Sequence, residues 1–162
     1  MKKVLLFLVA VMMTLFVSAQ TIVFQENFES PTIGLVSSAD SAGYAISNFQ
    51  AWAASTQLYK SGLKSDSNAL QVGKTIYLTT NSFATTGNAF VVLEFSQICK
   101  LYFADGGIIE VSIDGGNTWT PIGAAEYLGT GNLITSGNVS KFSDNAYPEW
   151  LAGTNTIPTN SW

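Results

Sequence analysis

The chain has 162 residues with seven lysines, no arginine, no histidine and eleven acidic residues, so its net charge is −4 at pH 7. Without clustered Lys and Arg it lacks the electrostatic footprint that binds phosphate, which excludes nucleic acid as a partner. Without histidine it also lacks the usual base that activates a nucleophilic thiol or hydroxyl.

Residues 1–19 have the three-part layout of a secretory signal peptide. Two lysines precede an apolar run of 14 residues, and the small residues Ser18 and Ala19 come just before Gln20. The run is shorter than the roughly 20 residues that span a bilayer as a helix. We therefore expect cleavage after Ala19, no membrane span in the mature chain, and a secreted or outer-cell-surface location. With five lysines against eleven acids, residues 20–162 have a net charge of −6.

The mature part predicts a single all-β domain. Residues 22–29 alternate with a period of two, which is typical of a strand. Residues 35–64 hold no period for long and predict an ordered loop. Strand signals return at residues 69–80. They are strongest at residues 89–103, where β-branched and aromatic side chains predict a central strand pair with a bend.

The sequence SIDGGNTW follows a further predicted strand at residues 108–113 and matches the pattern S-x-D-x-G-x-T-W. This pattern resembles the Asp-box hairpin of many secreted β-proteins. We expect the Asp114 carboxylate to accept hydrogen bonds from turn amides and the Trp119 ring to pack beneath the turn. Its expected role is structural, with direct ligand contact as the alternative. The defining residues are Ser112, Asp114, Gly116, Thr118 and Trp119.

Motifs for catalysis are missing from the sequence. The Asp-box pattern occurs once, whereas a propeller repeats it in each blade, and a chain without arginine cannot hold a sialate carboxylate as sialidases do. No GxSxG or HExxH string is present. Eleven acids leave a glycosidase-type carboxylate pair as the alternative, but nothing in the sequence singles out a pair. We therefore expect no catalytic residues in this segment.

Glu26 and Glu29 form the candidate metal site. Both lie in FQENFES near the expected mature N-terminus, and carboxylates in such a position join backbone carbonyls around calcium, a cation that prefers oxygen ligands. The alternative interpretation is two solvated acids at a strand edge. Calcium is the one cofactor that the sequence suggests, and its role would be structural.

Cysteine and aromatic side chains provide the remaining candidates. Cys99 is the only cysteine, so it cannot form an internal disulfide, and we predict an inert, buried thiol, with a reactive or intermolecular one as the alternative. Aromatic faces stack on sugar rings at small cost in entropy. The aromatic residues in loop-like stretches are candidates for this role, with loop packing as the alternative; they are Tyr44, Trp52, Tyr59 and Trp150.

The signal ending SAQ and the segments FQENFES, VVLEFSQICKLYF and VSIDGGNTWTPI, in this order, resemble the cleaved-adhesin or choice-of-anchor J domain. Such domains are MAM-like, galactose-binding-like jelly-rolls of secreted Bacteroidota proteins, and the resemblance spans roughly residues 22–162. It implies a jelly-roll-like β-sandwich. In the family another strand follows at the position of Trp162, and a type IX secretion sorting domain often comes later, so we expect the domain at residues 20–162 to be truncated.

These observations lead to one main functional hypothesis and two alternatives. The main hypothesis is a noncatalytic binding or adhesion module, secreted or displayed at the cell surface, with a glycan or a surface protein as its partner. The first alternative is the N-terminal accessory domain of a secreted peptidase or glycosidase whose catalytic part lies beyond this segment. The second alternative is a structural spacer without a ligand.

Overall fold

The computed structural model describes residues 20–41, 50–69, 71–101, 105–129, 133–136, 139–143 and 146. The expected signal peptide, Tyr44 and Trp150 lie outside the described residues. All regular elements in the described ranges are strands, which pair in small antiparallel sheets, and none of these residues is helical. The all-β prediction is therefore confirmed. No helix long and apolar enough to cross a membrane was found in the described part of the chain.

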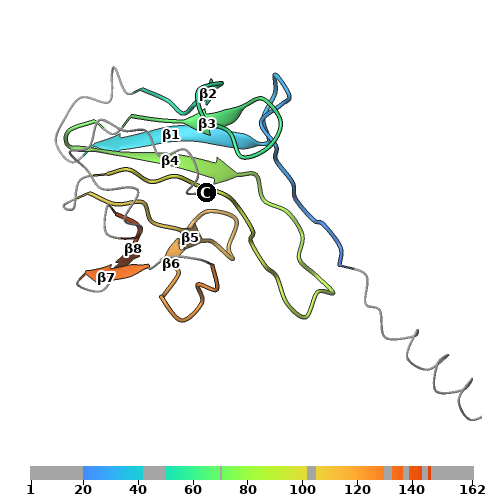
Figure 1. The fold of residues 1–162 in the computed structure, drawn as a ribbon. Helices are drawn as coiled ribbons and strands as arrows, with labels where there is room; N and C mark the ends of the chain where they lie inside the picture. The colour runs from blue at the N-terminus through green and yellow to red at the C-terminus, as the bar shows by residue number, and fades with distance from the viewer. Residues whose placement is uncertain are drawn as a thin grey trace, which may run out of the picture.

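The longest strands are β1 (Leu35–Ser41) and β4 (Lys74–Thr80), which pair antiparallel from Leu35 opposite Thr80 to Ser41 opposite Lys74. The sequence of β4, KTIYLTT, is rich in β-branched and aromatic residues, which favour a pleated surface. The sequence of β1, LVSSADS, has no such preference, and its pairing with β4 makes it a strand. The two run side by side through the middle of the molecule (Figure 1).

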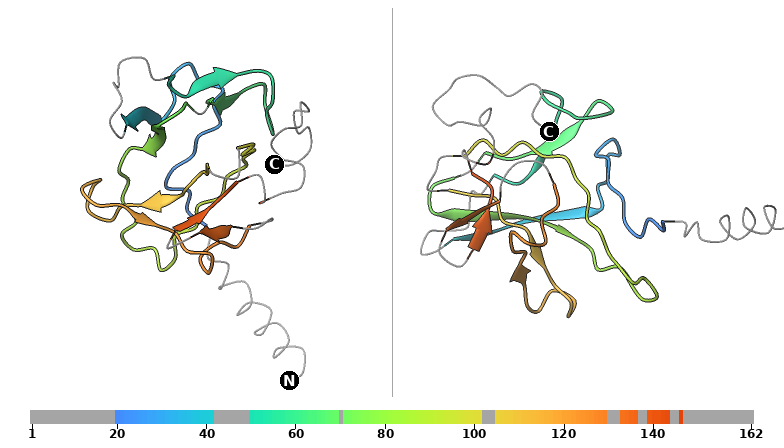
Figure 2. Two further views of the ribbon diagram at one scale, coloured as in Figure 1. Left: turned by 90° about the vertical axis from the view of Figure 1, so that its left-hand side faces the viewer. Right: turned by 60° about the horizontal axis from the view of Figure 1, so that its bottom comes forward.

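The other strands lie on two sides of the β1–β4 pair (Figures 1 and 2). On one side, β2 (Ala53–Ser55) pairs antiparallel with β3 (Ser65–Ser67). On the other side are two further antiparallel pairs. They are formed by β5 (Glu110–Val111) with β6 (Thr120–Pro121), and by β7 (Ile134–Ser136) with β8 (Val139–Lys141).

The core of the described residues lies between the β5–β6 and β7–β8 pairs. Its centre is Phe142, whose side chain is 1% exposed and whose ring meets that of Tyr127 edge to face at a centroid distance of 5.3 Å. Phe142 also exchanges two backbone hydrogen bonds with Gly107, of 2.9 and 2.8 Å. The other members of the cluster are Leu133 and Ala146, with Ile98, Cys99, Ile109 and Ile122 packed against them.

Three sequence-based element assignments were wrong. Residues 22–29 form no strand; the carboxylates of this segment instead accept backbone hydrogen bonds, and Phe28 has a φ of 61° that interrupts an extended chain. The predicted loop at residues 35–64 contains β1 and β2. The predicted strand pair at residues 89–103 is absent from its described part, 89–101, which runs without ladder pairing.

Candidate functional site

The hairpin at residues 112–119 connects β5 to β6 and is organised by the Asp114 carboxylate. Oδ1 of Asp114 accepts hydrogen bonds from the Asn117 and Thr118 amides at 3.0 and 2.9 Å, and Oδ2 accepts one from the Thr118 hydroxyl at 2.6 Å. The Ser112 hydroxyl donates to Oδ1 at 2.8 Å and accepts from the Gly116 amide at 2.7 Å. The side chains of the motif therefore bind the turn backbone directly.

Glycine is required at the tip of this hairpin. Gly115 and Gly116 have φ angles of 75° and 94°, a region that side chains disfavour. The Trp119 ring lies beside Gly116, 3.8 Å from where a Cβ would stand, which is ordinary van der Waals distance, so the positive φ and not the space is what favours glycine. The turn and the tryptophan thus form one unit.

Trp119 is held against the turn and also faces solvent. Its indole N–H donates to the Gly116 carbonyl at 3.2 Å, which fixes the orientation of the ring. The side chain remains 45% exposed. The hairpin therefore presents an aromatic surface whose position is set before any ligand arrives, and this arrangement is suited to binding.

The Asp114 carboxylate is expected to keep the hairpin intact well into the acidic range. The hydrogen bond from the Thr118 hydroxyl, followed by that from its amide, lowers the pKa of Asp114 from its ordinary value of 3.8 to about 2. For a carboxyl with a lowered pKa, the stabilisation is complete above pH 3.8 and is lost as the pH falls through about 2. Amide NMR shifts of residues 117 and 118 should titrate with a midpoint near pH 2, and a midpoint near 4 would contradict the hydrogen-bonded arrangement.

Glu26, the first predicted metal ligand, folds the N-terminal segment back on itself. Its Oε1 accepts the amides of Asn27 and Phe28 at 2.9 and 2.7 Å, and Oε2 accepts the Gly34 amide at 2.5 Å. The bond from Gly34 contributes most to lowering the pKa of Glu26. The Phe24 ring packs against Gly34 as well, so the two ends of this loop are joined by polar and apolar contacts.

Glu29, the second predicted ligand, makes a long-range contact. Its Oε1 accepts the amides of Leu63 at 2.7 Å and Lys64 at 2.9 Å, which lie just before β3. A Cβ on Gly62, whose φ is 70°, would collide with the same carboxylate. Glu29 therefore fastens the N-terminal segment to the β2–β3 hairpin.

Asp66 on β3 is an acid that the sequence did not single out. Its Oδ2 is buried without a hydrogen-bond partner among the described residues. Burial raises the pKa of Asp66, and the nearby charge of Glu26 adds to the effect. The fold thus brings Glu26 close to a carboxylate 40 positions later, and no local sequence pattern predicts that pairing. In the described ranges, no group of three or more Cys, Asp or Glu side chains is arranged to hold a metal ion.

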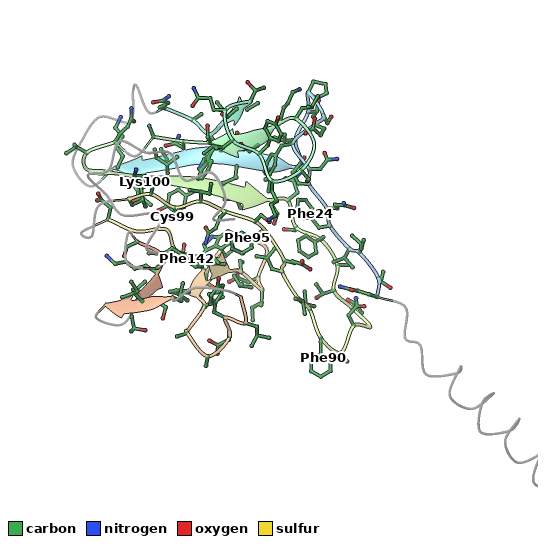
Figure 3. The ribbon with its side chains drawn as sticks, viewed as in Figure 1. Phe24, Phe90, Phe95, Cys99, Lys100 and Phe142 are labelled. Atoms are coloured by element: carbon green, nitrogen blue, oxygen red, sulfur yellow. The ribbon has the colours of Figure 1, made fainter. Side chains whose placement is uncertain are left out.

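Cys99 lies half-buried against the core, and its thiol faces the carbonyl oxygen of Phe142 at 3.8 Å (Figure 3). Desolvation raises the pKa of Cys99 to about 11. Because the thiolate is the nucleophile, we expect thiol–disulfide exchange at pH 8 to be on the order of 100-fold slower in the folded chain than in urea. Equal rates measured with a chromogenic disulfide reagent would contradict this environment.

The loop aromatics divide into packed and exposed residues. Trp52 is half-buried; its amide donates to the Ser37 hydroxyl at 3.0 Å, and its indole N–H is buried without a partner in the described part of the chain. Tyr59 is exposed. Trp119, which was expected to be mainly structural, is also exposed, so the accessible described aromatics of interest are Tyr59 and Trp119.

Comparison with known proteins adds no relative: no family model, curated protein or solved structure matches this chain.

Proposed function

We propose that this protein is a noncatalytic binding or adhesion module, secreted or displayed at the outer cell surface and built on a jelly-roll-like β-sandwich. The proposed ligand class is carbohydrate, and a surface protein is the competing partner. The signal-like N-terminus, the acidic mature chain and the all-β architecture support this proposal. The observation that carries it is the exposed and fixed ring of Trp119.

Trp119 has the properties of a sugar-binding platform. A tryptophan supplies a large rigid face with few rotatable bonds, so stacking on it costs little conformational entropy. The bond from its indole N–H to Gly116 removes part of the remaining freedom before binding. The same turn carries the polar side chains of Asn117 and Thr118, which donate hydrogen bonds to Asp114. An apolar face beside polar groups matches the alternating surface of a pyranose.

Binding to a glycan array tests the proposal. We expect the chain beginning at Gln20 to retain at least one glycan, and Trp119→Ala to weaken that binding by 10-fold or more, about 1.4 kcal/mol. Trp119→Tyr keeps an aromatic face and should bind within a few-fold of the wild type. Binding by Trp119→Tyr would show that the loss of binding in Trp119→Ala is due to the missing aromatic ring.

Tyr59→Ala is the matched control, because it removes an exposed aromatic ring from a different part of the surface. It should bind like the wild type. No retained glycan, or equal binding by the wild type and Trp119→Ala, would overturn the proposed carbohydrate site. A protein ligand that binds the wild type and not Trp119→Ala would instead favour a surface protein as the partner.

A structural calcium ion near Glu26 and Glu29 stays a prediction and forms part of this proposal. The orphaned Oδ2 of Asp66 supports it, because a buried carboxylate oxygen without a hydrogen bond suits a hard cation. Glu26 lies close enough to Asp66 to raise its pKa. Glu26 and Glu29 remain the proposed ligands, joined by backbone carbonyls; because the three carboxylates are not gathered into one group in the described residues, binding would have to draw Glu29 and Asp66 towards Glu26.

The variant Asp66→Asn separates the calcium-bound and calcium-free cases. Because burial raises the pKa of Asp66, its charge costs stability at pH 7 when no cation is present. In chelator we therefore expect Asp66→Asn to melt at a higher temperature than the wild type. In calcium the wild type should gain stability and the variant should not. Equal melting temperatures of the wild type in calcium and chelator would overturn the metal site.

A further inference from the structure

Residues 90–95 form an exposed apolar segment. Phe90 is 88% exposed and lies near the tip of a long excursion that leaves the end of β4 (Figure 3). Val91, Val92 and Leu93 are each more than half exposed, and Phe95 is nearly so. Apart from Glu94 the segment carries no charge. Five large apolar side chains in six consecutive positions make an unusual surface for a monomer.

The backbone of this segment is also available for pairing. Residues 90–95 contain no turn or bend, and they make no backbone hydrogen bond to any other residue within the described ranges. Their composition, β-branched and aromatic, is typical of strands. An extended segment with unpaired N–H and C=O groups is a template for another strand. Such a template combines hydrogen bonding with burial of apolar surface.

We propose that residues 90–96 pair antiparallel with the same segment of a second copy of this chain, about a two-fold axis at Leu93. A two-fold axis perpendicular to a two-stranded ribbon keeps each side chain on the same face in both copies. Residues that lie opposite each other must therefore be separated by an even number of positions, and an axis at Leu93 meets that condition. Leu93 then lies opposite itself and Val91 lies opposite Phe95. One face of the ribbon becomes a continuous apolar stripe from both copies.

Charge also favours this register. Each Glu94 lies opposite Val92 of the other copy, so the two acids of the interface do not face each other. Like charges directly opposite would destabilise the pair, whereas apolar and aromatic cross-strand pairs contribute roughly 0.2–1 kcal/mol each. The net charge of −6 per mature copy opposes association, but salt at physiological strength screens it beyond about 8 Å. The cross-strand pairs within the segment, and not the net charge of the two copies, therefore determine the register of the contact.

The area is sufficient for a weak dimer. Pairing covers part of the exposed side chains of both copies, whose complete burial would remove on the order of 1,000 Å² together, so the contact falls in the range of weak interfaces. We accordingly expect a reversible dimer with a dissociation constant in the micromolar range. Because an isologous contact uses the same edge of the segment in both copies, that edge is filled in the dimer, and we expect the dimer to be the main assembly. This inference does not depend on the proposed carbohydrate site.

Sedimentation velocity of the chain beginning at Gln20, from about 1 to about 200 μM, tests the association. We expect a dimer fraction that rises with concentration, and we expect Leu93→Lys to be monomeric throughout. Leu128→Lys is the matched control, because Leu128 is 92% exposed and lies outside the segment. It should dimerise like the wild type. A monomeric wild type, or a dimer that survives Leu93→Lys, would overturn the proposal.

Cross-linking tests the register. In a Cys99→Ala background, Leu93→Cys should form a disulfide with its own copy, since directly paired strand residues lie within about 5.5 Å, inside disulfide range. Val92→Cys is displaced by two residues along the ribbon, beyond the roughly 7 Å limit, and should cross-link far less. Leu128→Cys should behave as an unpaired surface thiol. Equal cross-linking at all three positions, or open-ended polymers, would contradict a two-fold axis at Leu93.

Discussion

Replacing Phe142 by alanine should lower the free energy of unfolding by about 3–5 kcal/mol, the largest effect of any single change considered for this protein. The ring is 1% exposed and fills the centre of the cluster that joins the β5–β6 and β7–β8 pairs. Its loss removes the edge-to-face contact with Tyr127 and leaves a cavity beside Ile109 and Ile122. The backbone bonds to Gly107 can persist, so the cost comes mainly from lost packing.

Urea unfolding followed by tryptophan fluorescence measures this effect. Leu128→Ala is the control, because its side chain is 92% exposed and its removal should change stability by less than about 0.5 kcal/mol. A loss below about 1 kcal/mol for Phe142→Ala would mean that the core lies elsewhere.

The second largest effect is expected for Glu29→Ala, at about 1–3 kcal/mol. The change removes the acceptor of two charge-assisted hydrogen bonds and leaves the amides of Leu63 and Lys64 without their side-chain partner. Glu29→Gln keeps a carbonyl oxygen that can accept both bonds, so it should lose less. The loss of stability in Glu29→Gln measures the contribution of the charge, and the additional loss in Glu29→Ala measures the contribution of the hydrogen-bond acceptor.

Amide hydrogen exchange locates the effect. In Glu29→Ala the amides of Leu63 and Lys64 should exchange faster, while the Gly34 amide, which is bonded to Glu26, should be unchanged. Faster exchange at Gly34 alone would contradict the assignment of Glu29 to the β2–β3 hairpin. The exchange rate of the Gly34 amide, measured in each Glu29 variant, thus serves as the internal control.

Local chemistry made some parts of this structure predictable from the sequence. The hairpin at residues 112–119 depends on contacts within eight residues, and its Ser, Asp, Gly and Trp positions each have a direct role in the turn. Strand β4 was predictable because its own residues favour a pleated surface. The all-β class follows from such signals.

Long-range contacts decided what the sequence could not predict. Strand β1 forms through its register with β4, although its sequence of small polar residues resembles a loop. The alternation at residues 22–29 resembled a strand, yet Glu26 and Glu29 bind amides at Gly34, Leu63 and Lys64. Asp66 lies on β3, and its proximity to Glu26, 40 positions earlier, is a contact of the folded chain that no local pattern contains.

The segment at residues 90–95 also shows that local sequence does not predict long-range pairing, here because a predicted strand has no strand partner in the described residues. Its β-branched and aromatic residues predict a buried strand, and these residues are exposed without a strand partner in the described chain. Propensity states which backbone conformation a segment favours, and it does not state which strand will pair with it. The pairing proposed above would reconcile its composition with its surroundings.

The most direct test of the binding account is a titration of the ¹⁵N-labelled chain with a glycan selected on the array, observing the tryptophan indole N–H signals. The chain has four tryptophans, and Trp119→Tyr assigns the signal of interest by its absence. We predict that the Trp119 indole signal shifts in a saturable way while the Trp52 signal, from a half-buried indole, stays in place. A saturable shift of another indole with none at Trp119 would contradict the hairpin as the binding surface.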